Sequence, residues 1–171
     1  KMAENVVDLV VKRFAKEGRN FGSCRTKTLP ISGGDIGGSD QLGSFIAKAA
    51  DQAVSYGFTK EEGEQLARLY GSNVDTVFSY GQQYEKLKEC PLPRILYARL
   101  MYAIEHEMVV KPVDFFIRRT GAVYFHIDMV ETWKEPVLHW MAQHYGWDEN
   151  EMKQYRKELD DEIQKARFPV K

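Results

Sequence analysis

Two carboxylates, Glu105 and Glu107, and two arginines, Arg118 and Arg119, are the residues of this chain with the clearest capacity for chemistry. Counting helical turns along residues 97–108 puts both carboxylates beside an apolar face. Burying an unpaired carboxylate is costly, so each needs a cation or hydrogen-bond donors, and the two arginines are the nearest candidates. Such a cluster is typical of an acid/base site or of an anion-binding site.

The same residues can also form a purely structural network. Asp114 lies four residues before Arg118 and can pair with it along a helix. Because structural ion pairs perturb carboxylates as readily as catalysis does, we favour an ionic clamp between two helices. The clamp hypothesis predicts that Glu107→Gln or Arg118→Met lowers thermal stability. Its members are Glu105, Glu107, Asp114, Arg118, Arg119 and Thr120.

Other chemistry has weaker support in the sequence. His106 and the glutamates beside it are consecutive, so on a helix they point in different directions and cannot share one metal ion. The glycines within residues 33–38 fit neither common phosphate-loop pattern and follow no strand, which favours a flexible loop. Cys24 and Cys90 show no metal-ligand spacing and are expected to be reduced thiols. We predict no catalytic, cofactor-binding or metal-binding residue in this chain.

Composition limits the kind of molecule that must position these residues. The chain has 171 residues, 43% apolar and 29% charged, and a formal net charge of −1, which suits one ordinary globular domain. The basic stripe of a nucleic-acid-binding protein is missing, so nucleic acid is disfavoured as a partner. No apolar run approaches the roughly 20 residues that span a bilayer. We expect a cytoplasmic protein that can also bind peripherally to the inner face of the cell membrane.

Helix start and stop signals recur at short intervals along the chain, and alternation typical of strands never persists. Two capping boxes are predicted, Thr59 with Glu62 and Asp148 with Glu151. No fixed-period repeat occurs, so a solenoid is disfavoured. The sequence predicts an all-α, irregular fold of about seven or eight helices.

Prolines refine the expected helix ends. Pro112 suits the first turn of a helix. Pro136 should kink the helical segment 124–144 or split it in two. The last helix, which is highly charged, is expected to run up to Pro169 at the surface.

The first residues of the chain predict a helix whose apolar face has no packing partner in this sequence. Residues 2–14 carry a broad apolar face directly after Lys1, with no capping residue before it, which we interpret as the result of an upstream sequence that is missing here. Residues 18–40 contain several glycines and Pro30 and are predicted to form a linker that runs over another surface. The expected organisation is a helix in residues 1–17, a linker in 18–40 and a helical domain in 41–171.

The segment 97–122 reads Tyr97-Ala-Arg-Leu-Met-Tyr-Ala-Ile-Glu-His-Glu-Met-Val-Val-Lys-Pro-Val-Asp-Phe-Phe-Ile-Arg-Arg-Thr-Gly-Ala122. This segment resembles the C-terminal signature of FAD-dependent glycerol-3-phosphate dehydrogenases and the related α-glycerophosphate oxidases. Shorter matches stand in the same order as in that family: Lys1-Met-Ala-Glu4, Thr26-Lys27 followed by Gly33-Gly34, and Tyr70-Gly71-Ser72. Together these matches cover most of the chain.

The resemblance implies a part of a larger flavoenzyme. It implies that residues 1–17 are the last helix of an upstream flavin domain, and that the flavin and substrate ligands lie upstream as well. The parent enzyme would oxidise sn-glycerol 3-phosphate to dihydroxyacetone phosphate, passing hydride to FAD and then electrons to quinone or oxygen. This chain would bind no cofactor and be inactive alone, bracing or covering the flavin and substrate domains, with homodimer and peripheral membrane contacts as further implied partners.

Two alternatives remain from the residues themselves. One is a free-standing helical protein-interaction module, against which the unmatched apolar face of residues 2–14 argues. The other is a small independent enzyme that uses Glu105, Glu107 and Arg118. The sequence immediately upstream in the native gene separates these alternatives, because a flavoenzyme needs a dinucleotide-binding fingerprint there.

Overall fold

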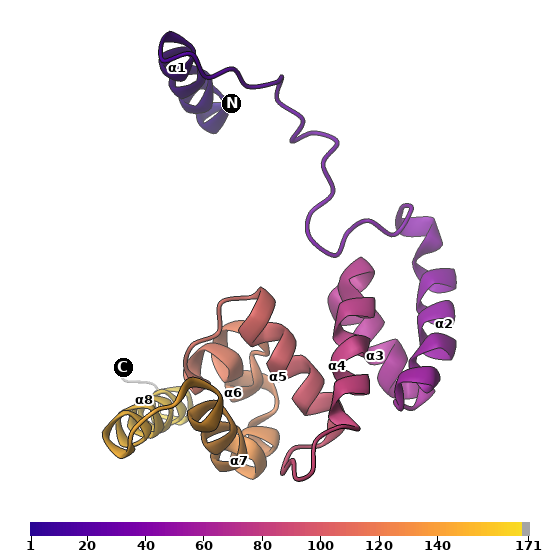
Figure 1. Ribbon diagram of the computed structural model, residues 1–171, viewed down its shortest axis with the longest axis vertical. Helices are drawn as coiled ribbons and strands as arrows, with labels where there is room; N and C mark the ends of the chain where they lie inside the picture. The colour runs from indigo at the N-terminus through magenta and orange to yellow at the C-terminus, as the bar shows by residue number, and fades with distance from the viewer. Residues whose placement is uncertain (169–171) are drawn as a thin grey trace. The chain divides into compact units, whose positions relative to one another are not determined.

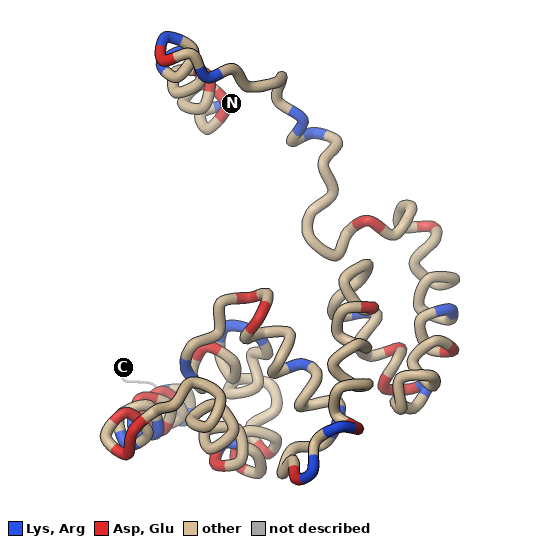
Figure 2. The backbone as a smooth tube through the Cα atoms, viewed as in Figure 1, with Lys and Arg blue, Asp and Glu red and all other residues tan. Residues whose placement is uncertain are grey.

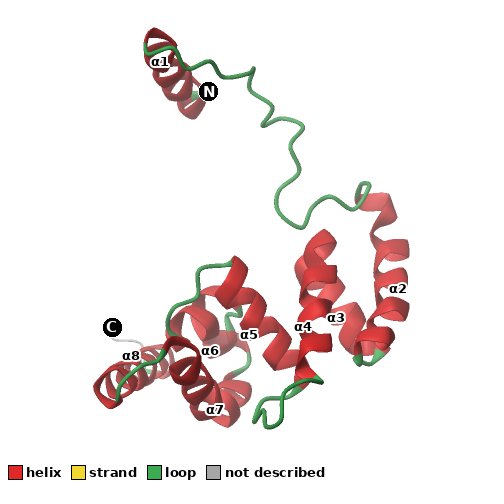
Figure 3. Cartoon of the chain, in the orientation of Figure 1, coloured by secondary structure: helices red, strands yellow, loops and turns green. Residues whose placement is uncertain are grey.

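A computed structural model describes residues 1–168 of the chain (Figure 1). Helices and loops make up this described part, and no strand occurs in it (Figure 3). The all-α prediction is therefore confirmed, with eight α-helices over residues 1–168 and no repeat in their arrangement. The predicted end at Pro169 lies outside the described residues. The chain divides into two compact units, one from Lys1 to Ile31 and one that begins at Ser32.

The first unit consists of helix α1 (Met2–Lys16) and an extended loop. Helix α1 buries none of its residues, and Val10, in the middle of its apolar face, is 44% exposed. The one aromatic contact in this unit joins Phe14 and Phe21, whose ring centroids are 5.8 Å apart. The apolar face of α1, which the sequence predicts to lack a packing partner, is therefore uncovered within the described residues.

Helices α2 (Leu42–Ala53) and α3 (Lys60–Tyr70) pack side by side in the second unit (Figure 1). Gly57, at φ +81°, ends the short 3₁₀ turn η2 (Val54–Tyr56) that follows α2. Thr59 then starts α3 with the predicted capping box. A Cβ atom at Gly63 would lie 2.5 Å from that of Ala53, so the glycine permits this close helix pair.

Helix α4 (Val74–Tyr84) packs on α5 (Arg94–His106), and this pair carries the centre of the core. The 3₁₀ turn η3 (Gly71–Asn73) links α3 to α4. The largest fully buried side chains come from several elements: Leu66, Phe78, Leu92, Leu100, Phe115, Phe116, Leu138 and Met141. Complete burial of one such side chain stabilises a fold by about 1.5–3 kcal/mol, so this core holds the helices of the second unit together.

The remaining elements are η4 (Asp114–Arg119), α6 (Ala122–Phe125), α7 (Ile127–Tyr145) and α8 (Glu149–Arg167). Helix α7 runs through Pro136 without a break, so the split that the sequence allowed does not occur. Pro112 stands in the first turn of the helical stretch that contains η4, as predicted. Asp148 and Glu151 form the predicted capping box of α8.

Helix α8 carries acidic and basic residues along its length (Figure 2), and several of them pair with residues of α7. Arg156 donates to both carboxylate oxygens of Glu135 at 2.8 and 2.9 Å, and Lys134 donates to Asp160 at 2.6 Å. The hydrogen bonds from Arg156 hold the pKa of Glu135 below its ordinary value. These pairs orient α8 on α7 while two apolar residues, Leu159 and Ile163, anchor it to the core. Neither α8 nor any other helix in residues 1–168 combines the length and apolar character needed to cross a membrane.

Candidate functional site at the end of helix α5

Helix α5 ends at a strained residue. Met108 has φ +59° and is the one residue other than glycine with positive φ in the described part of the chain. The backbone amides of Glu107 and Val109 both donate to the Ala103 carbonyl at 3.1 Å, which closes the helix in the way that usually requires glycine after it. This conformation costs an L-residue about 1–2 kcal/mol. The Met108 side chain is 86% exposed, so its own burial does not offset that strain.

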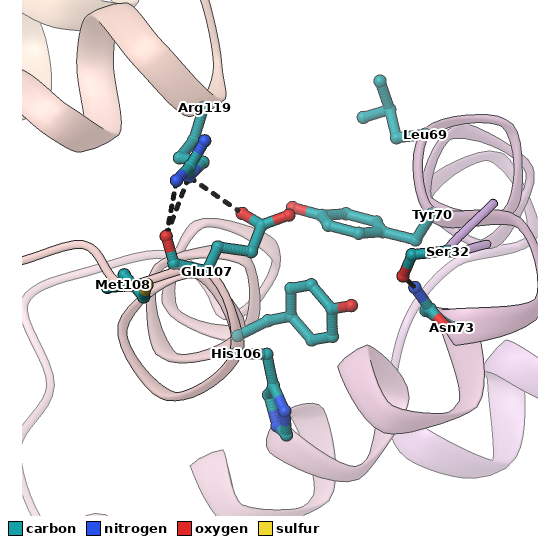
Figure 4. Close-up of a pocket in the computed structure, with 9 residues that line it drawn as sticks. Ser32, Leu69, Tyr70, Asn73, His106, Glu107, Met108 and Arg119 are labelled. Carbon is teal, nitrogen blue, oxygen red and sulfur yellow. Dashed lines mark hydrogen bonds and ion pairs between the residues drawn. The ribbon is translucent and has the colours of Figure 1, made fainter. Parts of the chain in front are cut away.

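Arg119 completes the same helix end. Its Nε and Nη2 atoms donate to the backbone carbonyl of Glu107 at 3.0 and 2.6 Å, while the Glu107 carboxylate lies 3.8 Å from Nε (Figure 4). The last carbonyls of a helix lack partners within the helix, and a cation there also suits the helix dipole. Arg119 thus binds α5 mainly through the backbone, although the sequence pointed to a carboxylate as its partner.

Asp114 links its own turn to the segment before it. One of its carboxylate oxygens forms an ion pair with Arg118, the helical pair expected from the sequence. The other accepts from the backbone amides of Val110 and Lys111 at 3.1 and 3.0 Å. Asp114 therefore caps the start of the turn that leads into η4, and Arg118 lies on the outside with 60% of its side chain exposed.

Thr120 joins η4 to α6. Its hydroxyl lies 3.0 Å from the Phe115 carbonyl and 3.2 Å from the Phe116 carbonyl, and it accepts from the Ala122 amide at 3.2 Å. η4 is a π-helix, and the Thr120 amide donates to the Phe115 carbonyl five residues earlier. The hydroxyl therefore satisfies backbone groups at a point where the helix changes direction.

Glu105 does not join this arrangement. Its side chain is 48% exposed, and its carboxylate lies 3.8 Å from Nε2 of His144, with no arginine in ion-pair range among residues 1–168. The expectation that it leans on an apolar face is wrong, because the last turn of α5 extends beyond the core that buries Tyr97 and Met101. Helical periodicity predicts the helix face on which a residue lies. It does not predict how much of that face is buried by neighbouring elements.

A pocket of about 430 Å³ lies beside the end of α5 (Figure 4). The rings of Tyr70 and Tyr102 meet edge to face in it, with centroids 5.0 Å apart. Asn73 donates to the Ser32 hydroxyl at 2.8 Å and so fastens the loop before α2 to the start of α4. The pocket is lined by Ser32, Leu69, Tyr70, Asn73, Tyr102, His106, Glu107, Met108 and Arg119.

The titratable groups of this pocket do not form a catalytic pair. Burial raises the pKa of both Tyr70 and Tyr102, so the two phenols remain protonated at neutral pH. His106 lies 3.1 Å through Nε2 from the hydroxyl of Tyr80 and stacks on Tyr102 at 4.9 Å. No three histidine, cysteine or acidic side chains in residues 1–168 gather in a way that could hold a metal ion. The geometry suits hydrogen bonding and helix fastening.

Sequence reasoning missed the aromatic and amide groups of this pocket. Tyr70 and Asn73 come from a turn that is far in sequence from α5, and only the fold brings them together. The weak matches at Gly33-Gly34 and at Tyr70-Gly71-Ser72 were the available signal, because the Ser72 amide donates to the Gly33 carbonyl at 3.0 Å. Two short segments that looked unrelated therefore form one contact.

The comparisons with known proteins agree with this architecture. A family model described as the C-terminal domain of alpha-glycerophosphate oxidase matches residues 24–152. The chain belongs to this family. This member of the alpha-glycerophosphate oxidase C-terminal domain family spans about a third of the length of the curated relatives it matches.

Two curated relatives and one solved structure define the similarity of this family member. It is 40% identical over 175 residues to the aerobic glycerol-3-phosphate dehydrogenase of Bacillus subtilis, covering 99% of this chain and 31% of that protein. It is 44% identical over 168 residues to that of Staphylococcus saprophyticus, covering 96% and 30%. The crystal structure of the glycerol-3-phosphate dehydrogenase from Bacillus halodurans complexed with FAD matches with a TM-score of 0.87 and 38% identity, over 99% of this chain and 34% of that chain.

This domain itself does not fit FAD. Dinucleotide sites of this kind need a parallel sheet and a glycine-rich turn between a strand and a helix. The structure described for residues 1–168 is helical, without a strand, and the glycines near residue 33 pack against the turn at Tyr70 and Gly71. No step of flavin chemistry is therefore assigned to residues of this chain.

Proposed function

We propose that this chain is the C-terminal helical part of a parent protein that uses FAD to oxidise sn-glycerol 3-phosphate to dihydroxyacetone phosphate, with quinone or oxygen as the electron acceptor. The observation that carries the proposal is the match of 99% of this chain to about a third of a glycerol-3-phosphate dehydrogenase complexed with FAD. The relatives, whose names describe the same activity, support it with 40% and 44% identity. In the parent protein, this part braces or covers the flavin and substrate domains and performs no catalysis alone.

The proposal assigns a separate role to each segment. Residues 1–17 are the last helix of the flavin domain, residues 18–40 are a linker, and residues 41–171 are the helical domain. The exposed apolar face of α1 supports the first assignment, because a helix that buries nothing in its own unit needs a partner surface. The bond between Asn73 and Ser32 supports a linker that is fastened at its far end.

Two more partners belong to the same proposal, a second copy of the parent protein and the inner face of the cell membrane. Exposed aromatic side chains supply apolar surface for either contact, notably Tyr124 and Phe125 on α6, which are 59% and 78% exposed. A free-standing interaction module is the alternative function. It has less support, since each relative is a protein about three times as long as the region that it shares with this chain.

The bracing role predicts an effect of Val10→Glu that appears only in the parent protein. Val10 lies in the middle of the apolar face of α1, so its docked side chain would contribute about 1.5–3 kcal/mol, and a buried carboxylate would add a further cost. We expect the FAD-loaded parent protein with Val10→Glu to melt several degrees lower and to release FAD sooner, as followed by flavin fluorescence during heating.

Asn5→Glu is the matched control, because it adds the same charge on the polar side of α1. It should leave the parent protein unchanged, and both substitutions should leave the melting of the 171-residue chain unchanged, because α1 buries nothing there. Equal melting temperatures of the two variants of the parent protein would exclude α1 as a docked helix of the flavin domain.

A further inference from the structure

Arg99 is a partly buried cation for which the second unit supplies no counter-ion. It lies on α5, and its Nε atom is buried without a hydrogen-bond acceptor among the described residues. None of the ion pairs within residues 1–168 involves it. Its polar neighbour is the neutral phenol of Tyr70, whose pKa is raised by burial and lowered by the charge of Arg99 and by a hydrogen bond from the guanidinium. A buried donor of a charged group that lacks an acceptor is costly, so Nε of Arg99 leaves room for an acceptor from outside this chain.

A second pocket, separate from the one at the end of α5, adjoins this guanidinium. It has a volume of about 220 Å³ and is lined by Gln65, Arg99, Thr120, Ala122, His126 and Met129. One water occupies about 30 Å³ in the liquid, so the pocket has room for a tetrahedral oxyanion together with part of a larger molecule.

The lining selects for negative charge. Arg99 offers only donors, and Gln65 and His126 can each donate one hydrogen bond more. The Thr120 hydroxyl is already occupied by backbone groups, and no carboxylate lines the pocket. His126 and Met129 belong to the start of the 19-residue helix α7, whose dipole adds positive potential on the same side. A cationic or wholly apolar ligand would leave Nε of Arg99 without an acceptor.

We propose that this pocket is a binding site for a small phosphate-type oxyanion, held by Arg99 through its planar fork of donors and by Gln65 and His126. The site is distinct from the proposed substrate chemistry of the parent protein and does not depend on it. Its ligand is either inorganic phosphate or the phosphate group of a small monoester, since both present the same oxygens to the guanidinium.

Calorimetric titration of the 171-residue chain tests the site. Inorganic phosphate and sn-glycerol 3-phosphate are titrated separately, with sodium chloride of equal ionic strength as the blank. We expect saturable binding of at least one of them with a Kd on the order of millimolar or tighter. Tighter binding of the monoester would assign the site to a small metabolite, and equal binding would assign it to phosphate itself. Arg99→Met should weaken binding at least about tenfold, because a hydrogen bond to a charged group is lost.

Two further variants complete the test. Lys153→Met removes an equal charge from an exposed position on α8 and should leave binding unchanged. Gln65→Glu places a carboxylate in the pocket, so it should abolish phosphate binding while raising the melting temperature of the chain, which keeps the test valid if Arg99→Met fails to fold. The proposal is overturned if neither anion binds, or if binding survives Gln65→Glu or a folded Arg99→Met.

Discussion

Gly71→Ala is expected to destabilise the second unit by about 3 kcal/mol or more, the largest effect of any single methyl group considered for this chain. Gly71 has φ +51°, and an added Cβ atom would lie 1.9 Å from the backbone oxygen of Gly33. The obstacle is backbone on both sides, and the amide of Ser72 already bonds to that same oxygen. The loop before α2 would have to detach, and the bond between Asn73 and Ser32 would be lost with it.

Urea unfolding followed by circular dichroism measures this effect. Gly43→Ala is the control in the same unit, because its Cβ atom would meet nothing within 4 Å and its backbone is helical. Replacing glycine by alanine in a helix typically stabilises it by roughly 0.5–1 kcal/mol. If Gly71→Ala unfolds at the same urea concentration as Gly43→Ala, the contact between the loop and the turn after α3 does not stabilise this fold.

The two adjacent arginines, Arg118 and Arg119, should contribute very differently to the stability of the fold. Arg119→Met should cost about 1.5–2 kcal/mol, because its two bonds to the Glu107 carbonyl are charge-assisted and no other donor replaces them. Arg118→Met should cost about 0.5 kcal/mol or less, since it breaks an exposed pair with Asp114. In melting temperature, this corresponds to roughly 3–8 °C for Arg119→Met and 2 °C or less for Arg118→Met.

Differential scanning calorimetry of the two variants decides between backbone capping and a carboxylate clamp. Glu107→Gln should resemble Arg118→Met, because the carboxylate lies 3.8 Å from Arg119 while the backbone carbonyl makes the shorter bonds. A Glu107→Gln variant that melts as low as Arg119→Met would instead favour the ionic clamp. The ionic clamp of Glu105, Glu107, Asp114, Arg118, Arg119 and Thr120 remains a prediction that this measurement tests.

The local elements were predictable because their signals are local. Thr59 with Glu62 and Asp148 with Glu151 form the expected capping boxes, since a cap depends on residues three positions apart. The left-handed Gly57 that ends η2 is a signal of the same local kind, because positive φ costs little for glycine alone.

The site was less predictable because it depends on features that sequence spacing does not encode. Met108 adopts the left-handed conformation that glycine usually supplies, and nothing in its type announces this. The π-helix at Asp114–Arg119 widens one turn, so counting 3.6 residues per turn misplaces the arginines at its end. Glu105 lies beyond the edge of the core, and Arg99 lacks a carboxylate partner within residues 1–168, which only the assembled fold shows.

The proposed function places this chain in a flavoprotein that oxidises glycerol 3-phosphate, and it assigns no catalysis to the chain itself. The most direct measurement adds sn-glycerol 3-phosphate, without oxygen, to the parent protein and to the 171-residue chain while recording visible absorbance. We predict that the parent protein shows a flavin spectrum that bleaches on addition of the substrate, and that the 171-residue chain shows none. A parent protein whose flavin is not reduced, or a 171-residue chain that is itself yellow, would contradict the account.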